Sequence, residues 1–125
     1  MGRHKIKAEY RLEKAQYMYT RWYIRRYPQL MQQREEILEG SAAPADGQPR
    51  GTGISNPTLS KTEQLEDVNV KLFPITAGLE SIPEEYRRGV FEHIIYRRMY
   101  PDFAAISTWK RWEQRYIYFV ALYLG

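Results

Sequence analysis

The sequence predicts an all-α protein: a small helical domain with a C-terminal helix-turn-helix-like pair and an N-terminal helical extension. Large apolar residues recur every three or four positions over most of the 125 residues, which is the spacing of one face of an α-helix. Serine precedes glutamate by three residues at two points where such a series begins, as in helix capping boxes. No segment shows the polar and apolar alternation of a strand, so no strand is predicted.

The first helix is predicted over residues 5–27, which contain strong helix formers and neither glycine nor proline. One apolar stripe, repeated every seven residues, consists of Tyr10, Tyr17 and Ile24. A second stripe on nearly the opposite side consists of Leu12, Ala15, Tyr19 and Trp22. A helix that is apolar on two sides contacts two neighbours, and a second copy of the chain is one candidate.

Pro28 either kinks this helix or opens another over residues 29–39, because proline fits a first helical turn but not an interior. Residues 40–57 follow, with seven glycines and prolines and one large apolar side chain, Ile54, which predicts a flexible linker. The chain therefore divides into an N-terminal helical region (1–39) suited to oligomerisation, a linker (40–57) and a helical domain (58–125).

Two capping boxes are predicted in the helical domain. Ser60 and Glu63 open a helix over residues 61–79, which contains Pro74. Its inward series is Leu65, Val68, Leu72, Ile75 and Leu79. Ser81 and Glu84 open the next helix, which is expected to end near residue 99, before Pro101.

Ser107 is predicted to cap the last helix, residues 108–124. Its inward arc consists of Trp109, Trp112, Tyr116, Phe119, Val120 and Tyr123. The opposite side displays long hydrogen-bonding or cationic side chains and a phenol, namely Lys110, Arg111, Gln114, Arg115 and Tyr118. This side is either an ordinary solvated face or a surface for an anionic partner.

Several classes of chemistry are not expected. The chain has no cysteine, and its only histidines, His4 and His93, are not at the spacing of a metal site or catalytic motif. We therefore predict no enzyme activity, catalytic residue, metal or cofactor. No apolar run is long enough to span a membrane and the N-terminus lacks a signal-peptide core, so we expect a soluble cytoplasmic protein with no membrane partner.

Charge is distributed unevenly around a net value of +4. Residues 1–39 carry nine basic and five acidic side chains, residues 40–82 three and five, and residues 83–125 seven and five. Basic ends attract polyanions, although many proteins with this balance bind no nucleic acid. Arginines interleaved with aromatic residues over 17–27 fit stacking on single-stranded nucleic acid, but helix–helix contact explains them more simply.

The last two predicted helices have the arrangement that a helix-turn-helix reader of DNA requires. Lys110, Arg111 and Arg115 could bind guanine, and Gln114 could pair with adenine. Ser107 and Thr108 could hold a phosphate where the helix begins. On physical grounds this interpretation and a solvated terminal helix carry equal weight.

The order of four segments resembles a known family. They are RRYPQLMQQREEIL, NPTLSKTEQL after the spacer, SIPEEYRRGVFEHIIYRRMYPDF, and ISTWKRWEQRYIYFVALYLG at the end. This layout resembles the RinA-like late-gene transcriptional regulators of phages and prophages of Gram-positive bacteria, which are similar to sigma-factor region 4. Sigma-type domains place a full short helix where this sequence has only residues 100–107.

The resemblance implies a sequence-specific transcriptional regulator, acting as an activator of phage late or packaging genes in a bacterial host. It gives residues 108–124 the role of recognition helix on double-stranded DNA. Ser107, Thr108, Lys110, Arg111 and Gln114 would then meet DNA, flanked by Arg115 and Tyr118. Host RNA polymerase and a second copy are further candidate partners. The alternatives are a small-terminase-like packaging subunit and a helical protein-interaction module that does not bind DNA.

Overall fold

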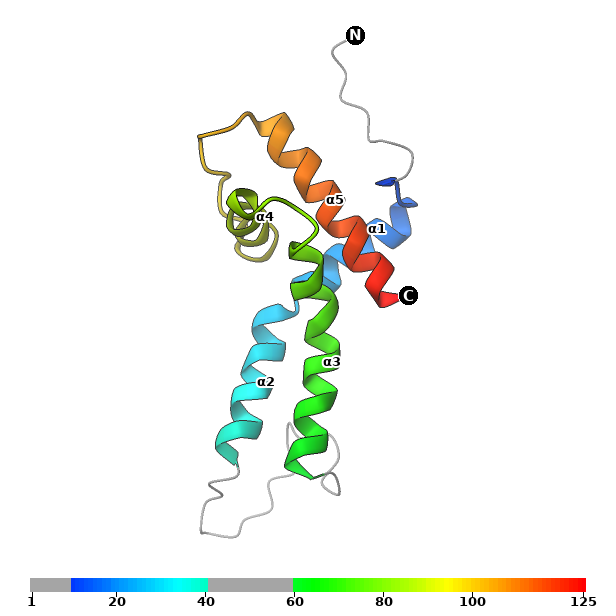
Figure 1. The fold of residues 1–125 in the computed structure, drawn as a ribbon, viewed down its shortest axis with the longest axis vertical. Helices are drawn as coiled ribbons and strands as arrows, with labels where there is room; N and C mark the ends of the chain where they lie inside the picture. Colours follow the sequence, from blue (N-terminus) through cyan, green and yellow to red (C-terminus); the bar gives the residue numbers. More distant parts are fainter. Residues whose placement is uncertain (1–9, 41–59) are drawn as a thin grey trace.

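The protein is all-α in the part that the structure describes. The computed structural model describes residues 10–40 and 60–125, which form five helices: α1 (Lys14–Ile24), α2 (Tyr27–Gly40), α3 (Lys61–Leu79), α4 (Glu84–Tyr96) and α5 (Ile106–Leu124). Helices α2 and α3 run antiparallel and form an arm. Helices α1, α4 and α5 lie together at the end of this arm where α2 begins and α3 ends (Figure 1). The predicted fold class, a small helical domain, is confirmed.

Pro28 opens a second helix rather than kinking the first. Helix α1 ends at Ile24, Arg25 and Arg26 form a turn, and Pro28 lies in the first turn of α2. Proline costs little there because the N–H that it lacks would have no intrahelical acceptor. Within the described residues, the helix predicted over 5–27 begins later, at Lys14, and ends earlier, at Ile24. Residues 5–9 of that prediction lie outside the described residues.

One of the two predicted capping boxes is present. The Ser60 hydroxyl accepts a hydrogen bond from the Glu63 N–H (3.1 Å), and the Ser60 N–H donates to the Glu63 carboxylate (3.0 Å). The Ser81 box is wrong, because the Ser81 hydroxyl donates to the Gly78 carbonyl (2.6 Å) and Pro83 is the N-cap of α4. That hydroxyl satisfies an end of α3 instead of the start of α4.

The cap predicted for the last helix is also wrong. Helix α5 begins at Ile106 with Ala105 as its N-cap, so Ser107 lies inside the first turn. The helix before it ends at Tyr96, earlier than expected, because Arg97 adopts the left-handed conformation (φ 59°). The two helices are therefore joined by residues 97–105, in which the structure shows no helix.

Helix α5 contributes the largest buried side chains and contacts α1, α3 and α4. Its buried residues are Trp109, Glu113, Tyr116, Ile117, Val120 and Ala121. This face is rotated from the predicted arc, since Trp112 is only half-buried and Tyr123 is 49% exposed. The difference arises because α1 packs on the flank of α5 that contains Glu113, a residue outside the predicted arc.

A single core joins the helices on both sides of residues 41–59. Ile24 of α1 and Leu30 of α2 are fully buried in the same cluster as Ile75 of α3 and Ile94 of α4. Helices α2 and α3 pack along each other, and α1 packs against α5. The predicted linker lies outside the described residues except for Gly40, the last residue of α2.

Gly89 allows α4 to approach α5 closely. A Cβ atom at this position would lie 2.6 Å from two atoms of the Trp109 indole and 2.9 Å from Pro101 Cδ. Distances this short are not tolerated between carbon atoms, so no larger residue fits without movement of the ring. The indole of Trp109 thus lies directly against the α4 backbone.

Candidate nucleic-acid interface

The first two turns of α5 form an exposed positive end. Among the described residues no side chain caps this helix, no acidic residue lies in its first turn, and Lys110 and Arg111 are exposed. The first N–H groups of an α-helix lack intrahelical acceptors, and the helix dipole places partial positive charge there. This end of α5 therefore favours an anionic partner.

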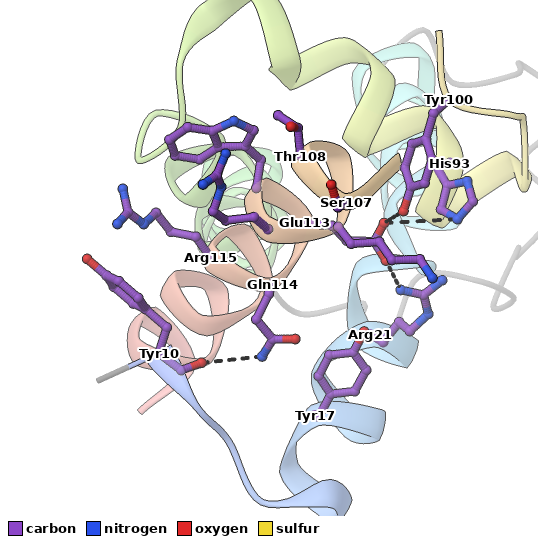
Figure 2. Close-up of a pocket in the computed structure, with 13 residues that line it drawn as sticks. Tyr10, Tyr17, Arg21, His93, Tyr100, Ser107, Thr108, Glu113, Gln114 and Arg115 are labelled. Atoms are coloured by element: carbon purple, nitrogen blue, oxygen red, sulfur yellow. Dashed lines mark hydrogen bonds and ion pairs between the residues drawn. The ribbon is translucent and has the colours of Figure 1, made fainter. Parts of the chain in front are cut away.

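Most of the predicted site residues line one pocket beside this end (Figure 2). The pocket has a volume of about 850 Å³ and is bordered by α1, α4, α5 and the segment before α1. Six of the seven predicted residues line it: Ser107, Thr108, Lys110, Arg111, Gln114 and Arg115. Tyr118 lies outside the lining and packs edge-on against Tyr10, with ring centroids 5.3 Å apart.

Tyr10 already occupies part of the predicted surface. The Gln114 side-chain amide donates to the Tyr10 carbonyl (3.3 Å), and the Arg115 guanidinium lies 4.4 Å from the centroid of the Tyr10 ring. Together with Tyr118, these residues form a half-buried patch. Lys110 and Arg111 are the cations of α5 that remain exposed.

The cations along α5 are not neutralised within the part of the chain that the structure describes. Among residues 10–40 and 60–125, Lys110, Arg111 and Arg115 form no ion pair. Arg111 and Arg115 lie instead over the Trp112 ring, 5.7 and 5.2 Å from its centroid. Their positive charge is therefore available to a ligand, and the ring restricts where the guanidinium groups can lie.

The floor of the pocket is a buried network around Glu113. Arg21 of α1 and the Tyr100 hydroxyl both donate to the Glu113 carboxylate, which is 6% exposed. The Nε2 atom of His93 lies 4.0 Å from the same carboxylate, and the His93 ring stacks on Tyr100 with centroids 4.0 Å apart. The network ties α1, α4 and the connection after α4 to α5, and Figure 2 shows these side chains converging on Glu113.

The network fixes the charge states of two of its members. Burial raises the pKa of Tyr100, and the hydrogen bond to Glu113 raises it further. Burial opposes the charge of Arg21, but its hydrogen bond and charge interaction with Glu113 outweigh this and raise its pKa overall. At neutral pH Arg21 is therefore charged and Tyr100 is a neutral donor, so the Arg21–Glu113 pair adds no net charge to the pocket.

The free energy of unfolding should decrease in alkaline solution, because Tyr100 and Tyr116 ionise less readily in the folded protein than in the unfolded chain. In the folded protein the pKa of Tyr100, and that of the buried Tyr116, is raised above the ordinary value of 10.0. The stabilisation is fully present below about pH 10 and is lost as the pH rises further, because the unfolded chain then releases protons that the folded chain retains. Urea denaturation from about pH 8 to about pH 11 should show this fall, with a shallower slope for Tyr100→Phe. An unchanged slope in that variant would contradict the assignment.

Sequence reasoning missed the residues that complete the pocket. Tyr10 is 104 residues from Gln114, and Arg21 is 92 residues from Glu113, so no spacing motif could connect them. One local signal existed, because Glu113 falls on the apolar side of α5, where an acidic residue requires a partner.

Other site types find no support in the described residues. No group of three or more His, Cys, Asp or Glu side chains in residues 10–40 and 60–125 could hold a metal ion. Within the same ranges, no helix combines the length and apolar character needed to cross a membrane. No protein-family model, curated protein or solved structure matches the chain.

Proposed function

We propose that the chain binds duplex DNA through the first two turns of α5 and acts as a transcriptional regulator of phage late or packaging genes. One observation supports the DNA-binding proposal: the helix start, which Ala105 does not cap with a side chain, displays the exposed cations Lys110 and Arg111, and neither forms an ion pair within the described residues. Cations and helix N-terminal N–H groups are the usual partners of DNA phosphates. The regulatory role rests on the resemblance to RinA-like regulators, which also suggests host RNA polymerase as a partner.

Phosphate binding and base reading would use different parts of the surface. Lys110, Arg111 and the first turn of α5 reach solvent directly, so they would hold the DNA backbone. Gln114 and Arg115 suit base edges, but Tyr10 contacts both of them. Reading of bases by these two residues therefore requires the segment around Tyr10 to move aside.

Fluorescence anisotropy of a labelled phage late-promoter duplex tests the proposal. Lys110→Ala and Arg111→Ala should each weaken binding and should each make the slope of log affinity against log salt shallower by about one. Lys71→Ala on α3 is the matched control, because Lys71 pairs with Asp67 (3.3 Å) and does not line the pocket. Tighter binding to the promoter than to a scrambled duplex supports a sequence-reading regulator. Equal losses in all three variants would remove α5 as the interface.

A second candidate function, association with a protein partner, is favoured by an exposed apolar face on α1. Met18, Tyr19 and Trp22 are 56%, 54% and 54% exposed, and all three lie on one side of the helix. Trp and Tyr are frequent at the centres of protein interfaces. The other apolar stripe of this helix packs into the core through Tyr17 and Ile24, so the exposed stripe remains for the second neighbour that the sequence predicts, and we propose a second copy as that neighbour.

Light scattering of the purified chain tests self-association. Wild type should be a dimer, and Trp22→Ser should be a monomer with an unchanged helical signal. A monomeric wild type would exclude this use of α1, and a large ring would favour the packaging-subunit alternative over a regulator.

A further inference from the structure

The pocket beside α5 has the size of a small-molecule site. Its volume of about 850 Å³ lies within the range of roughly 300–1,000 Å³ that is usual for ligand pockets. The proposed DNA interface uses the outer residues of this pocket. It makes no use of Tyr17 and Arg21 of α1 or of His93 of α4, which also line the pocket.

Three cations among the lining residues are suited to phosphate groups. Lys110, Arg111 and Arg115 all line the pocket and carry no internal counter-charge within the described residues. The Arg115 guanidinium contacts two rings, 4.4 Å from the centroid of Tyr10 and 5.2 Å from that of Trp112. These contacts orient a planar group that can donate two parallel hydrogen bonds to phosphate oxygens.

The remaining lining suits a planar, hydrogen-bonding group. Glu113 does not repel an anion, because Arg21 and Tyr100 already satisfy its carboxylate. Tyr10 and Tyr17 add aromatic surface, and Ser107 and Thr108 add hydroxyl groups. Rings of heterocyclic bases bind well to such aromatic surfaces. A ligand with a phosphate at one end and a heterocycle at the other matches both parts.

We propose that this pocket binds a phosphorylated ligand of nucleotide size, with its phosphate against the α5 cations and its ring toward Tyr17. Binding of such a ligand does not depend on the proposed DNA-binding function. One consequence does rest on that function: because Lys110 and Arg111 would serve both ligands, the nucleotide and duplex DNA would exclude each other.

Titration of the full chain with ATP tests the proposal, with tryptophan fluorescence as the readout. Trp112 lines the pocket, whereas Trp22 and Trp109 do not. ATP should give a saturable change in fluorescence. It should bind more tightly than adenosine, which lacks the phosphates, and more tightly than inorganic triphosphate, which lacks the heterocyclic ring. Lys110→Ala should weaken ATP binding about tenfold, the effect of one hydrogen bond to a charged group, while Lys71→Ala should not.

Two results would overturn the proposal. One is the absence of a saturable change up to about 10 mM ATP. The other is equal weakening by the two lysine variants, which would indicate a general charge effect. A 5′-phosphorylated single strand, titrated in parallel, distinguishes a strand terminus from a free nucleotide as the source of the same chemistry.

Tyr17→Leu separates this proposal from the DNA proposal. Tyr17 lies on the α1 side of the pocket, away from the exposed turns of α5 (Figure 2). Loss of its aromatic ring should weaken ATP binding and leave duplex binding unchanged. A chain that binds ATP but no duplex would refute only the DNA interface, and a chain that binds duplex but no ATP would refute only the nucleotide site.

Discussion

Replacing Trp109 by alanine is expected to lower the free energy of unfolding by about 3–5 kcal/mol. The indole is fully buried and contacts the rings of Tyr86, Tyr100 and Phe103, with centroids 4.9, 5.5 and 5.1 Å away. It also fills the space left by Gly89. Its removal opens a cavity where α4, the connecting segment and α5 meet, and the rigid surroundings can close that cavity only partly.

Urea denaturation followed by circular dichroism measures this effect, and two variants serve as controls. Trp112→Ala should cost clearly less, because Trp112 is only half-buried. Trp109→Phe should also cost less than alanine, since it keeps most of the ring and removes the buried indole N–H, which has no hydrogen-bond partner in the described residues. Equal losses for Trp109→Ala and Trp112→Ala would show that the core is not centred on Trp109.

Replacing Glu113 by alanine is expected to cost about 3–5 kcal/mol, the usual effect of removing one partner of a buried ion pair. The side chains of Arg21 and Glu113 are 19% and 7% exposed, so the guanidinium would be left without its counter-charge in a place that water reaches poorly. Tyr100 would lose the acceptor of its hydroxyl at the same time. These losses loosen α1 and the connecting segment from α5 together.

A double variant distinguishes this explanation from a simple loss of packing. Arg21→Met combined with Glu113→Leu removes both charges and retains apolar volume, so it should be more stable than Glu113→Ala. Denaturation of Arg21→Met alone, Glu113→Leu alone and the double variant gives the coupling energy. A double variant as unstable as the sum of the singles would argue against a coupled pair.

The helices were predictable from the sequence, but their first residues were not always so. Ser60 caps α3 as predicted, and its hydroxyl accepts a hydrogen bond from the Glu63 N–H. Ser81 presents the same pattern, yet it follows α3 closely enough to bond a carbonyl at the end of that helix. A capping pattern defines what a serine can do, and neighbouring backbone groups decide which bond forms.

The candidate site was predictable only as far as one helix extends. Ser107, Thr108, Lys110 and Arg111 share a helix, so their common surface follows from helical spacing. The contribution of Tyr10, Arg21 and Tyr100 depends on how α1 and the connection after α4 pack on α5. Such packing brings together residues about a hundred positions apart, which a pattern within one segment cannot show.

The central place of α5 also determines when the chain can fold during its synthesis. Helices α1, α3 and α4 all pack on α5, yet α5 is translated after them. Until it leaves the ribosome, the side chains that surround Trp109 and Tyr116 lack these two partners, although α2 can already pack on α3 and α1 on α4. Cooperative folding therefore begins after translation of these helices is complete, and the unfinished chain exposes apolar surface that chaperones recognise.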